Sequence, residues 1–176
     1  MKRIGLIGGM SWESSIEYER IINEEVRRRL GGTHSADLVI RSFNFAIIEQ
    51  LQEAGDWATA GDLLASAARD LEQCGAQLLV LCTNTMHRLA PEITSAVTIP
   101  LLHIADATGI HVQRAGLGTV GLLGTKYTME AEFYAGRLMK QHNLDIRTPA
   151  EAERNEVHRI IYDELVRGVI NDDSRQ

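Results

Sequence analysis

Aromatic side chains make up only 5% of this 176-residue chain, and no apolar stretch approaches the roughly 20 residues that span a bilayer. The scarcity of aromatic residues argues against a surface that stacks nucleic-acid bases. Basic residues are also few, 18 against 24 acidic ones, and the resulting net charge of −6 disfavours binding to phosphate backbones or anionic lipid. We therefore expect a small-molecule partner, with no nucleic acid and no membrane.

The chain contains only two cysteines, Cys74 and Cys82, and they have neither C-x-x-C nor metal-ligand spacing. Met1-Lys2-Arg3 leads directly into an apolar segment, without the pattern of a secretory signal. We expect a cytoplasmic protein whose cysteines stay reduced. The chain has no G-x-x-x-x-G-K loop, and Gly116-x-Gly118-x-x-Gly121 enters a predicted strand instead of following one. These patterns favour chemistry without a cofactor or a metal.

Short apolar runs alternate with helical patterns along the chain. Four runs are typical of parallel strands buried on both faces: Ile4–Ile7, Leu38–Ile40, Leu78–Leu81 and Val120–Leu123. Helical patterns cover Glu13–Leu30, Trp57–Cys74, His103–Arg114, Met129–His142 and Glu151–Val166. A Ser14-x-x-Glu17 capping box is expected to begin the first helix. The alternation predicts an α/β fold with parallel sheets flanked by helices.

A short segment of the sequence is repeated. Gly5-Leu6-Ile7-Gly8-Gly9 is matched 116 residues later by Gly121-Leu122-Leu123-Gly124-Thr125. Each copy joins an apolar run to a small-residue loop that opens a helix, so we predict two related Rossmann-like lobes, residues 1–102 and 103–176. The same offset would place the second-lobe counterpart of Cys82 beyond Gln176. We therefore expect a second lobe that is incomplete at its C-terminal end.

Polar residues gather just after the predicted strands, where open α/β sheets bind their ligands. They form three groups: Gly8-Gly9-Met10-Ser11, Cys82-Thr83-Asn84-Thr85 and Thr125-Lys126-Tyr127-Thr128. A helix beginning just after Cys82 could lower the pKa of its thiol from about 8.5 toward neutrality. The polar side chains of Thr83, Asn84 and Thr85 could hold a carboxylate beside the thiol. This group is a candidate acid/base site.

Structural roles compete with these interpretations. Cys82 could be a small buried hydrophobe and Asn84 a helix cap, which are common roles of both residue types. Four consecutive polar residues at the end of a strand nevertheless favour function for this group. Gly8-Gly9 fits an anion-binding turn and a purely steric turn equally well. For His87 and His103, structural roles are the stronger interpretation.

Three segments of the chain resemble the aspartate/glutamate racemase family, and in particular its broad-specificity branch. They are Gly8-Gly9-Met10-Ser11-Trp12-Glu13, Leu81-Cys82-Thr83-Asn84-Thr85-Met86-His87 and Leu102-His103-Ile104-Ala105-Asp106-Ala107-Thr108. The resemblance implies two pseudo-symmetric α/β lobes, a homodimer, and racemisation of acidic amino acids without pyridoxal phosphate or metal. It also implies two cysteines, of which one removes the α-proton and the other protonates the opposite face.

Cys82 matches the first cysteine of the family, whereas the Gly-Cys-Thr-Glu segment that carries the second is absent from this sequence. The resemblance therefore implies impaired racemisation by this chain. Seven residues match substrate-pocket positions: Met10, Gln52, Asn84, Thr85, Thr125, Tyr127 and Thr128. Ile48 and Glu164 fall where a basic residue for the distal carboxylate is expected, which implies a different side-chain preference. The alternatives are a non-catalytic module that binds amino acids or dicarboxylates, and a related cofactor-free isomerase.

Overall fold

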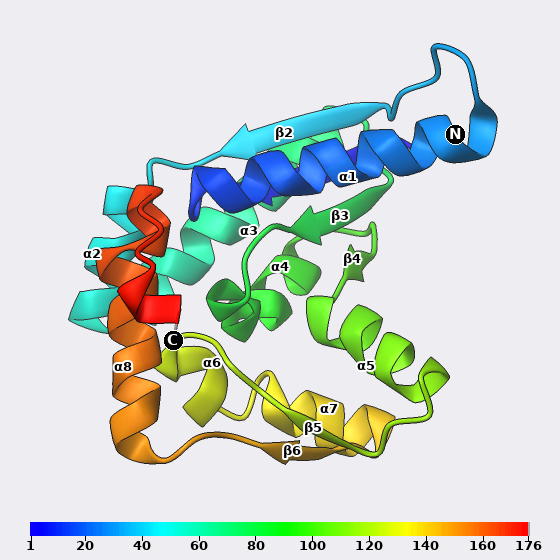
Figure 1. Ribbon diagram of the computed structural model, residues 1–176. Coiled ribbons are helices and arrows are strands. Elements are labelled where there is room, and N and C mark those ends of the chain that lie inside the picture. Colours follow the sequence, from blue (N-terminus) through cyan, green and yellow to red (C-terminus); the bar gives the residue numbers. More distant parts are fainter. Residues whose placement is uncertain (176) are drawn as a thin grey trace. The chain divides into compact units, whose positions relative to one another are not determined.

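A four-stranded parallel sheet organises the first of two units into which the chain divides, Met1–His103 and the part from Ile104 onward. The computed structural model describes residues 1–175 (Figure 1). The strands are β1 (Ile4–Gly8), β2 (Leu38–Ser42), β3 (Leu78–Leu81) and β4 (Leu101–Leu102), in the order β2-β1-β3-β4. All three pairings are parallel. The expected α/β fold with parallel sheets flanked by helices is confirmed.

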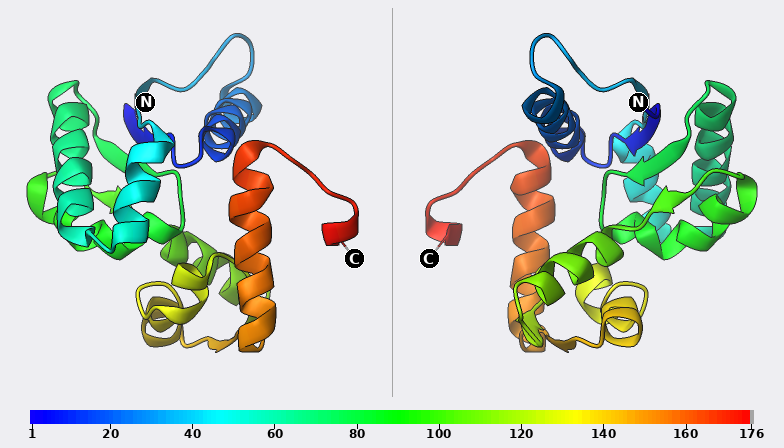
Figure 2. Two further views of the ribbon diagram at one scale, coloured as in Figure 1. Left: turned by 90° about the vertical axis from the view of Figure 1, so that its left-hand side faces the viewer. Right: turned by 90° about the vertical axis from the view of Figure 1, so that its right-hand side faces the viewer.

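Helices cover both faces of this sheet. They are α1 (Trp12–Leu30), α2 (Phe45–Ala54), α3 (Trp57–Gln73), the 3-10 helix η1 (Thr85–Leu89) and α4 (Ala90–Ala96). Figure 2 shows α1 on one face of the sheet and α3 on the other. The two faces differ in packing, because α3 buries seven residues whereas α1 buries none.

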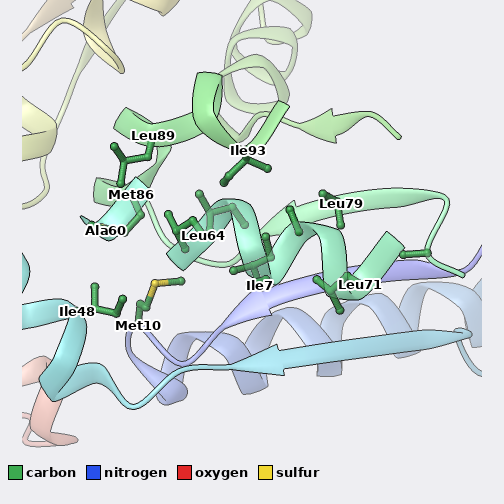
Figure 3. Packing of buried hydrophobic residues seen from close by; sticks show 14 residues of the cluster. Ile7, Met10, Ile48, Ala60, Leu64, Leu71, Leu79, Met86, Leu89 and Ile93 are labelled. Atoms are coloured by element: carbon green, nitrogen blue, oxygen red, sulfur yellow. The ribbon is translucent and has the colours of Figure 1, made fainter. Parts of the chain in front are cut away.

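The hydrophobic core of the first unit lies on the α3 side of the sheet. Ala60, Leu64, Ala67 and Leu71 recur at helical spacing and present one apolar stripe. This stripe packs against the inward residues of β1 and β3 and against η1 and α4 (Figure 3). A fully buried Leu or Ile side chain contributes about 1.5–3 kcal/mol, so this layer positions the carboxyl ends of the strands firmly.

In this unit one sequence-based expectation fails and one helix was not expected. Ser14 does not cap α1, because Ser11 occupies the N-cap position and Ser14 lies within the first turn. The helix α2 was not expected, although its end signals are in the sequence. Asn44 caps α2 by accepting the N–H of Ala46, and Gly55 ends it in the left-handed conformation.

The second unit contains a smaller parallel sheet in which Val120 of β5 (Thr119–Gly121) lies opposite Ile146 of β6 (Asp145–Arg147). Its helices are α5 (Ile104–Arg114), α6 (Lys126–Glu130), α7 (Ala135–His142) and α8 (Glu151–Asp163), followed by the 3-10 helices η2 (Leu165–Arg167) and η3 (Asp173–Arg175). The strand β6 was not expected from the sequence.

The single helix expected over Met129–His142 is wrong, because α6 ends at Glu130 and α7 begins at Ala135. The break has a physical reason. Met129 and Leu138 are both buried, yet nine positions along one continuous helix would place them on opposite faces. Separating the segment into two helices lets both side chains leave water.

An ion-pair cluster joins α5 to α7 within the second unit. Arg137 donates two hydrogen bonds of 2.7 Å to the carboxylate of Asp106, and Nε2 of His142 lies 3.2 Å from the same carboxylate. The ring of His142 lies so close to Gly109 that a Cβ there would be 2.3 Å from it. Ala105, Tyr134, Leu138 and Leu144 form the buried apolar cluster of this unit.

None of the helices within residues 1–175 is long and apolar enough to cross a membrane.

Candidate active site

The site begins where the connections of the first sheet change direction. Strand β1 lies between β2 and β3, so the chain leaves β1 toward one edge and later returns to its other side. Ligands of open α/β sheets bind outside the carboxyl ends of strands at such a point. Ile7 of β1 is the register partner of Leu81 of β3. The loops that follow β1 and β3 therefore start side by side, and they carry two of the polar groups found in the sequence.

Cys82 is held directly against the end of β1. Its backbone N–H donates to the carbonyl of Ile7 at 2.9 Å. Gly8 lies beside it, and a Cβ on Gly8 would be 4.0 Å from Cβ of Cys82 and 2.6 Å from Oγ of Ser15. Ser15 accepts the N–H of Gly9 at 2.8 Å and lies 3.0 Å from the carbonyl of Ser11. The glycine at position 8 thus lets α1 approach the cysteine closely.

The expectation of a low thiol pKa at Cys82 is wrong. The side chain is completely buried, and loss of hydration raises the pKa of the thiol to about 12. The short 3-10 helix η1 begins only at Thr85, so no α-helix N-terminus directly follows the sulfur. At neutral pH the thiol of Cys82 is therefore protonated, and it can donate a proton.

The loop after Cys82 is fixed by two side chains from different elements. The hydroxyl of Ser14 lies 3.1 Å from the carbonyl of Cys82 and 3.0 Å from that of Ser11, so one proton is shared between them. Nδ1 of His87 lies 2.6 Å from the carbonyl of Thr83. Within residues 1–175 the backbone N–H groups of Thr83 and Asn84 have no hydrogen-bond partner. Two consecutive donors beside a thiol suit a carboxylate.

The other predicted site residues of this unit differ in exposure. Thr85 is buried as the first residue of η1, whereas Asn84 is exposed. Met10 belongs to the hydrophobic core, as does Met86, and the buried Gln52 donates from Nε2 to the sulfur of Met86 at 3.0 Å. Of these five side chains, only that of Asn84 is exposed.

The residues predicted in the second unit form one cluster around α6. The side chain of Thr125 caps α6 by accepting the N–H of Thr128 at 3.3 Å. The ring of Tyr127 packs edge-to-face on His158 of α8, with centroids 5.7 Å apart. The N–H of Lys126 points to Nδ1 of His158 at 3.4 Å. Burial, followed by the charge of Lys126, lowers the pKa of His158 and favours the neutral ring that accepts this hydrogen bond.

Neither residue considered for the distal carboxylate offers a positive charge. Ile48 is completely buried within the hydrophobic core of the first unit. Glu164 is bound by Arg159 at 3.1 Å and by Ser174 at 3.0 Å. The structure thus gives both residues packing or ion-pair roles of their own.

Sequence reasoning missed the roles of Ser14 and Ser15 in shaping the site, and for His87 it favoured a structural role without naming the contact with the carbonyl of Thr83. Ser14 and Ser15 follow Ser11 by three and four residues, and at these spacings a serine hydroxyl can reach back to a backbone carbonyl. His87 lies four positions after Thr83, and that spacing did signal a contact. Within the described chain, no group of three or more His, Cys, Asp or Glu side chains could hold a metal ion.

The fold and the site define the class: an α/β protein with a parallel sheet and a buried thiol at the switch point of that sheet. Comparison with known proteins identifies the family. The chain belongs to the Asp/Glu/Hydantoin racemase family, which matches residues 7–176. The resemblance noted in the sequence is confirmed. Membership supports a racemase-type function.

Solved structures of related proteins share this architecture. A Yersinia pestis protein proposed to be an Asp/Glu racemase is 52% identical, with a TM-score of 0.91, over 99% of this chain and 76% of that one. An aspartate racemase homologue from Pyrococcus horikoshii is 35% identical, with a TM-score of 0.80, over 96% of this chain and 74% of that one. The aspartate racemase of Picrophilus torridus shares the fold at 20% identity, with a TM-score of 0.75, over 99% of this chain and 71% of that one.

Proposed function

We propose that this protein acts on acidic amino acids, aspartate or glutamate, by cofactor-independent proton transfer at Cα through Cys82. Family membership supports a racemase-type reaction. The observation that carries the proposal is the position of the Cys82 thiol at the switch point, next to the N–H groups of Thr83 and Asn84 that have no partner within residues 1–175. We further propose that the enzyme is a cytoplasmic homodimer.

The same two N–H groups would serve binding and catalysis. They would hold the α-carboxylate of the substrate, and they would stabilise the negative charge that the carboxylate gains when the α-proton leaves. Because burial keeps the thiol protonated, Cys82 is prepared to donate a proton to the carbanion on its own face. To remove the α-proton, Cys82 must react as the thiolate, so its own proton must first pass to hydroxide from the solvent; the thiolate then takes the α-proton and becomes a thiol again.

Inversion at Cα also needs an acid/base group on the opposite face. The other cysteine, Cys74, does not fit that role. The guanidinium of Arg3 donates to the carbonyl of Cys74 at 3.0 Å, which places Cys74 near the amino end of β1, whereas Cys82 follows the carboxyl end of β3. We therefore expect proton exchange on one face to exceed inversion.

Solvent exchange at Cα tests this proposal directly. L- and D-glutamate and L- and D-aspartate are incubated with the protein in D2O; deuterium at Cα is measured by NMR and enantiomer ratio by chiral chromatography. We expect deuterium incorporation to exceed inversion and Cys82→Ser to abolish incorporation. Cys74→Ser is the matched control and should exchange at the wild-type rate. No incorporation with any of the four substrates would refute the catalytic proposal.

The high pKa of Cys82 also supports a second candidate, a module that binds an amino acid or dicarboxylate without turnover. A thiol that stays protonated can line a pocket without reacting. Calorimetric binding of glutamate or aspartate together with no deuterium incorporation would favour the binding module. Deuterium incorporation into another carboxylic acid, with none into aspartate or glutamate, would instead indicate a related cofactor-free isomerase.

A further inference from the structure

We propose that His87 is a positioning residue of the Cys82 site, whose imidazole fixes the peptide between Thr83 and Asn84 and so directs the Asn84 N–H toward bound substrate. The inference rests on the proposed function, because it assigns the N–H of Asn84 to the substrate carboxylate. It adds a residue that acts through the backbone and does not itself touch the reacting atoms.

The contact of His87 with Thr83 requires a proton on Nδ1 of the ring. A carbonyl oxygen can only accept a hydrogen bond, so Nδ1 of His87, 2.6 Å away, must carry the proton. The ring has little freedom to leave this position. It is 1% exposed, and it packs against the ring of His103 with centroids 4.6 Å apart and planes inclined by 60°.

Peptide geometry converts this contact into control of a donor. In a planar trans peptide the C=O and the following N–H point in opposite directions. Drawing the carbonyl of Thr83 toward His87 therefore turns the N–H of Asn84 away from His87. Ser14 acts on the preceding peptide in the same way, since its hydroxyl lies 3.1 Å from the carbonyl of Cys82. Two side chains thus set the directions of two consecutive N–H groups.

The backbone of His87 restrains the same turn. Its N–H donates to the carbonyl of Asn84 at 3.1 Å, while its ring binds the carbonyl of Thr83. One residue therefore holds two successive carbonyls of the loop that carries the thiol. Replacing only the ring removes the first restraint and leaves the second, so a side-chain variant tests orientation of the Thr83–Asn84 peptide.

Asparagine and glutamine at position 87 provide a matched pair of variants. The amide nitrogen of asparagine can occupy the place of Nδ1, whereas that of glutamine extends to the place of Nε2. We expect His87→Gln to raise the Kd for L-glutamate or L-aspartate, whichever the wild type binds, about tenfold, because a charge-assisted hydrogen bond is lost. Where exchange is measurable, kcat should fall about ten- to a hundredfold. His87→Asn should recover most of both values.

Urea unfolding of both variants shows whether stability separates them. Equal impairment of His87→Asn and His87→Gln at equal stability would overturn the proposal, as would a wild-type Kd for His87→Gln. Long-range ¹H–¹⁵N NMR of the wild-type protein gives an independent result: a proton on Nδ1 is expected, and an unprotonated Nδ1 would overturn the proposal.

The two proposals fail in different ways. If Cys82→Ser exchanged the α-proton normally, the proposed function would be wrong, while the Nδ1 proton of His87 would still report its contact with Thr83. If Cys82→Ser abolished exchange and His87→Gln left both Kd and kcat unchanged, only the role of His87 would be wrong.

Discussion

Complete burial keeps a proton on the sulfur of Cys82 far above neutral pH, and this links the residue to stability. The thiol has a pKa of about 12 in the folded protein against an ordinary value of 9.0. Below pH 9 the thiol is protonated in both the folded and the unfolded state, so its contribution to stability is constant. Between pH 9 and 12 the unfolded state ionises first, and the free energy of unfolding falls by up to about 1.4 kcal/mol per pH unit.

We therefore predict that Cys82→Ala loses less stability than the wild type as pH rises above 9. Urea unfolding of both proteins at pH 8, 9, 10 and 11 measures the effect, since other groups that titrate in this range are common to both. A difference between the two proteins that does not change with pH would show that the thiol is accessible to water.

A glycine is required at position 9 both by the backbone conformation there and by the atoms packed against it. Its φ is +82°, and a Cβ there would lie 2.3 Å from the carbonyl oxygen of Phe43. Gly55 shares a positive φ, +68°, in the left-handed helical region, but has nothing within 4 Å of the same position. We predict that Gly9→Ala costs about 2–4 kcal/mol, from strain plus the clash, and Gly55→Ala only about 1 kcal/mol. Chemical denaturation compares the two, and equal losses would disprove the clash at Gly9.

At the scale of elements, the contact between α5 and α7 depends on one carboxylate. Asp106 binds Arg137 through both oxygens, with side chains only 28% and 33% exposed. We predict that Asp106→Asn costs about 2 kcal/mol, because it leaves the guanidinium partly buried without its charge partner. The control is Glu132→Gln, since the pair of Glu132 with Lys140 is largely exposed and should cost less than about 0.5 kcal/mol.

Hydrogen exchange of the amides in α5 and α7 measures the effect of Asp106→Asn within these two helices. A local measurement is needed because a chain of two units need not unfold in one step. Faster exchange confined to these helices is expected. Unchanged exchange there would mean that apolar packing alone holds α5 against α7.

The elements that the sequence predicted best are those with a continuous apolar run or with a periodic signal of sufficient length. The run Leu78–Leu81 and the stripe from Ala60 to Leu71 are such signals, and they became β3 and the buried face of α3. The short strand β6 has no comparable signal, because its burial alternates over only three residues. The break between α6 and α7 was hidden because the order of residues does not show which side chains need to be buried together.

For the site, the sequence indicated position better than chemical state. Residues that follow parallel strands must meet at one edge of the sheet, so the placement of Cys82 beside the Gly8-Gly9 turn could be predicted. The pKa of its thiol could not, because that value depends on complete burial, which is a property of the packed structure. The contact between His87 and Thr83 likewise depends on the 3-10 conformation of η1, which the sequence did not distinguish from an α-helix.

At the scale of the whole molecule, the two copies of the sequence repeat differ in how deeply their side chains are buried. Ile7 in the first copy is 0% exposed, because β1 lies between two neighbouring strands over its core. Leu123 is its counterpart in the second copy and is 68% exposed, and within the described residues β5 pairs only with β6. The same short motif therefore contributes a core residue in one unit and a surface residue in the other.

This contrast predicts that equivalent substitutions in the two copies reduce stability by very different amounts. Ile7→Ala should cost about 2–5 kcal/mol, since it removes three buried carbons from a packed core. Leu123→Ala should change the free energy of unfolding by less than about 0.5 kcal/mol, because water already surrounds most of the side chain. Urea unfolding followed by amide exchange in each unit tests the pair. If Leu123→Ala cost as much as Ile7→Ala, and the cost grew with protein concentration, Leu123 would be buried in solution against a second copy of the chain.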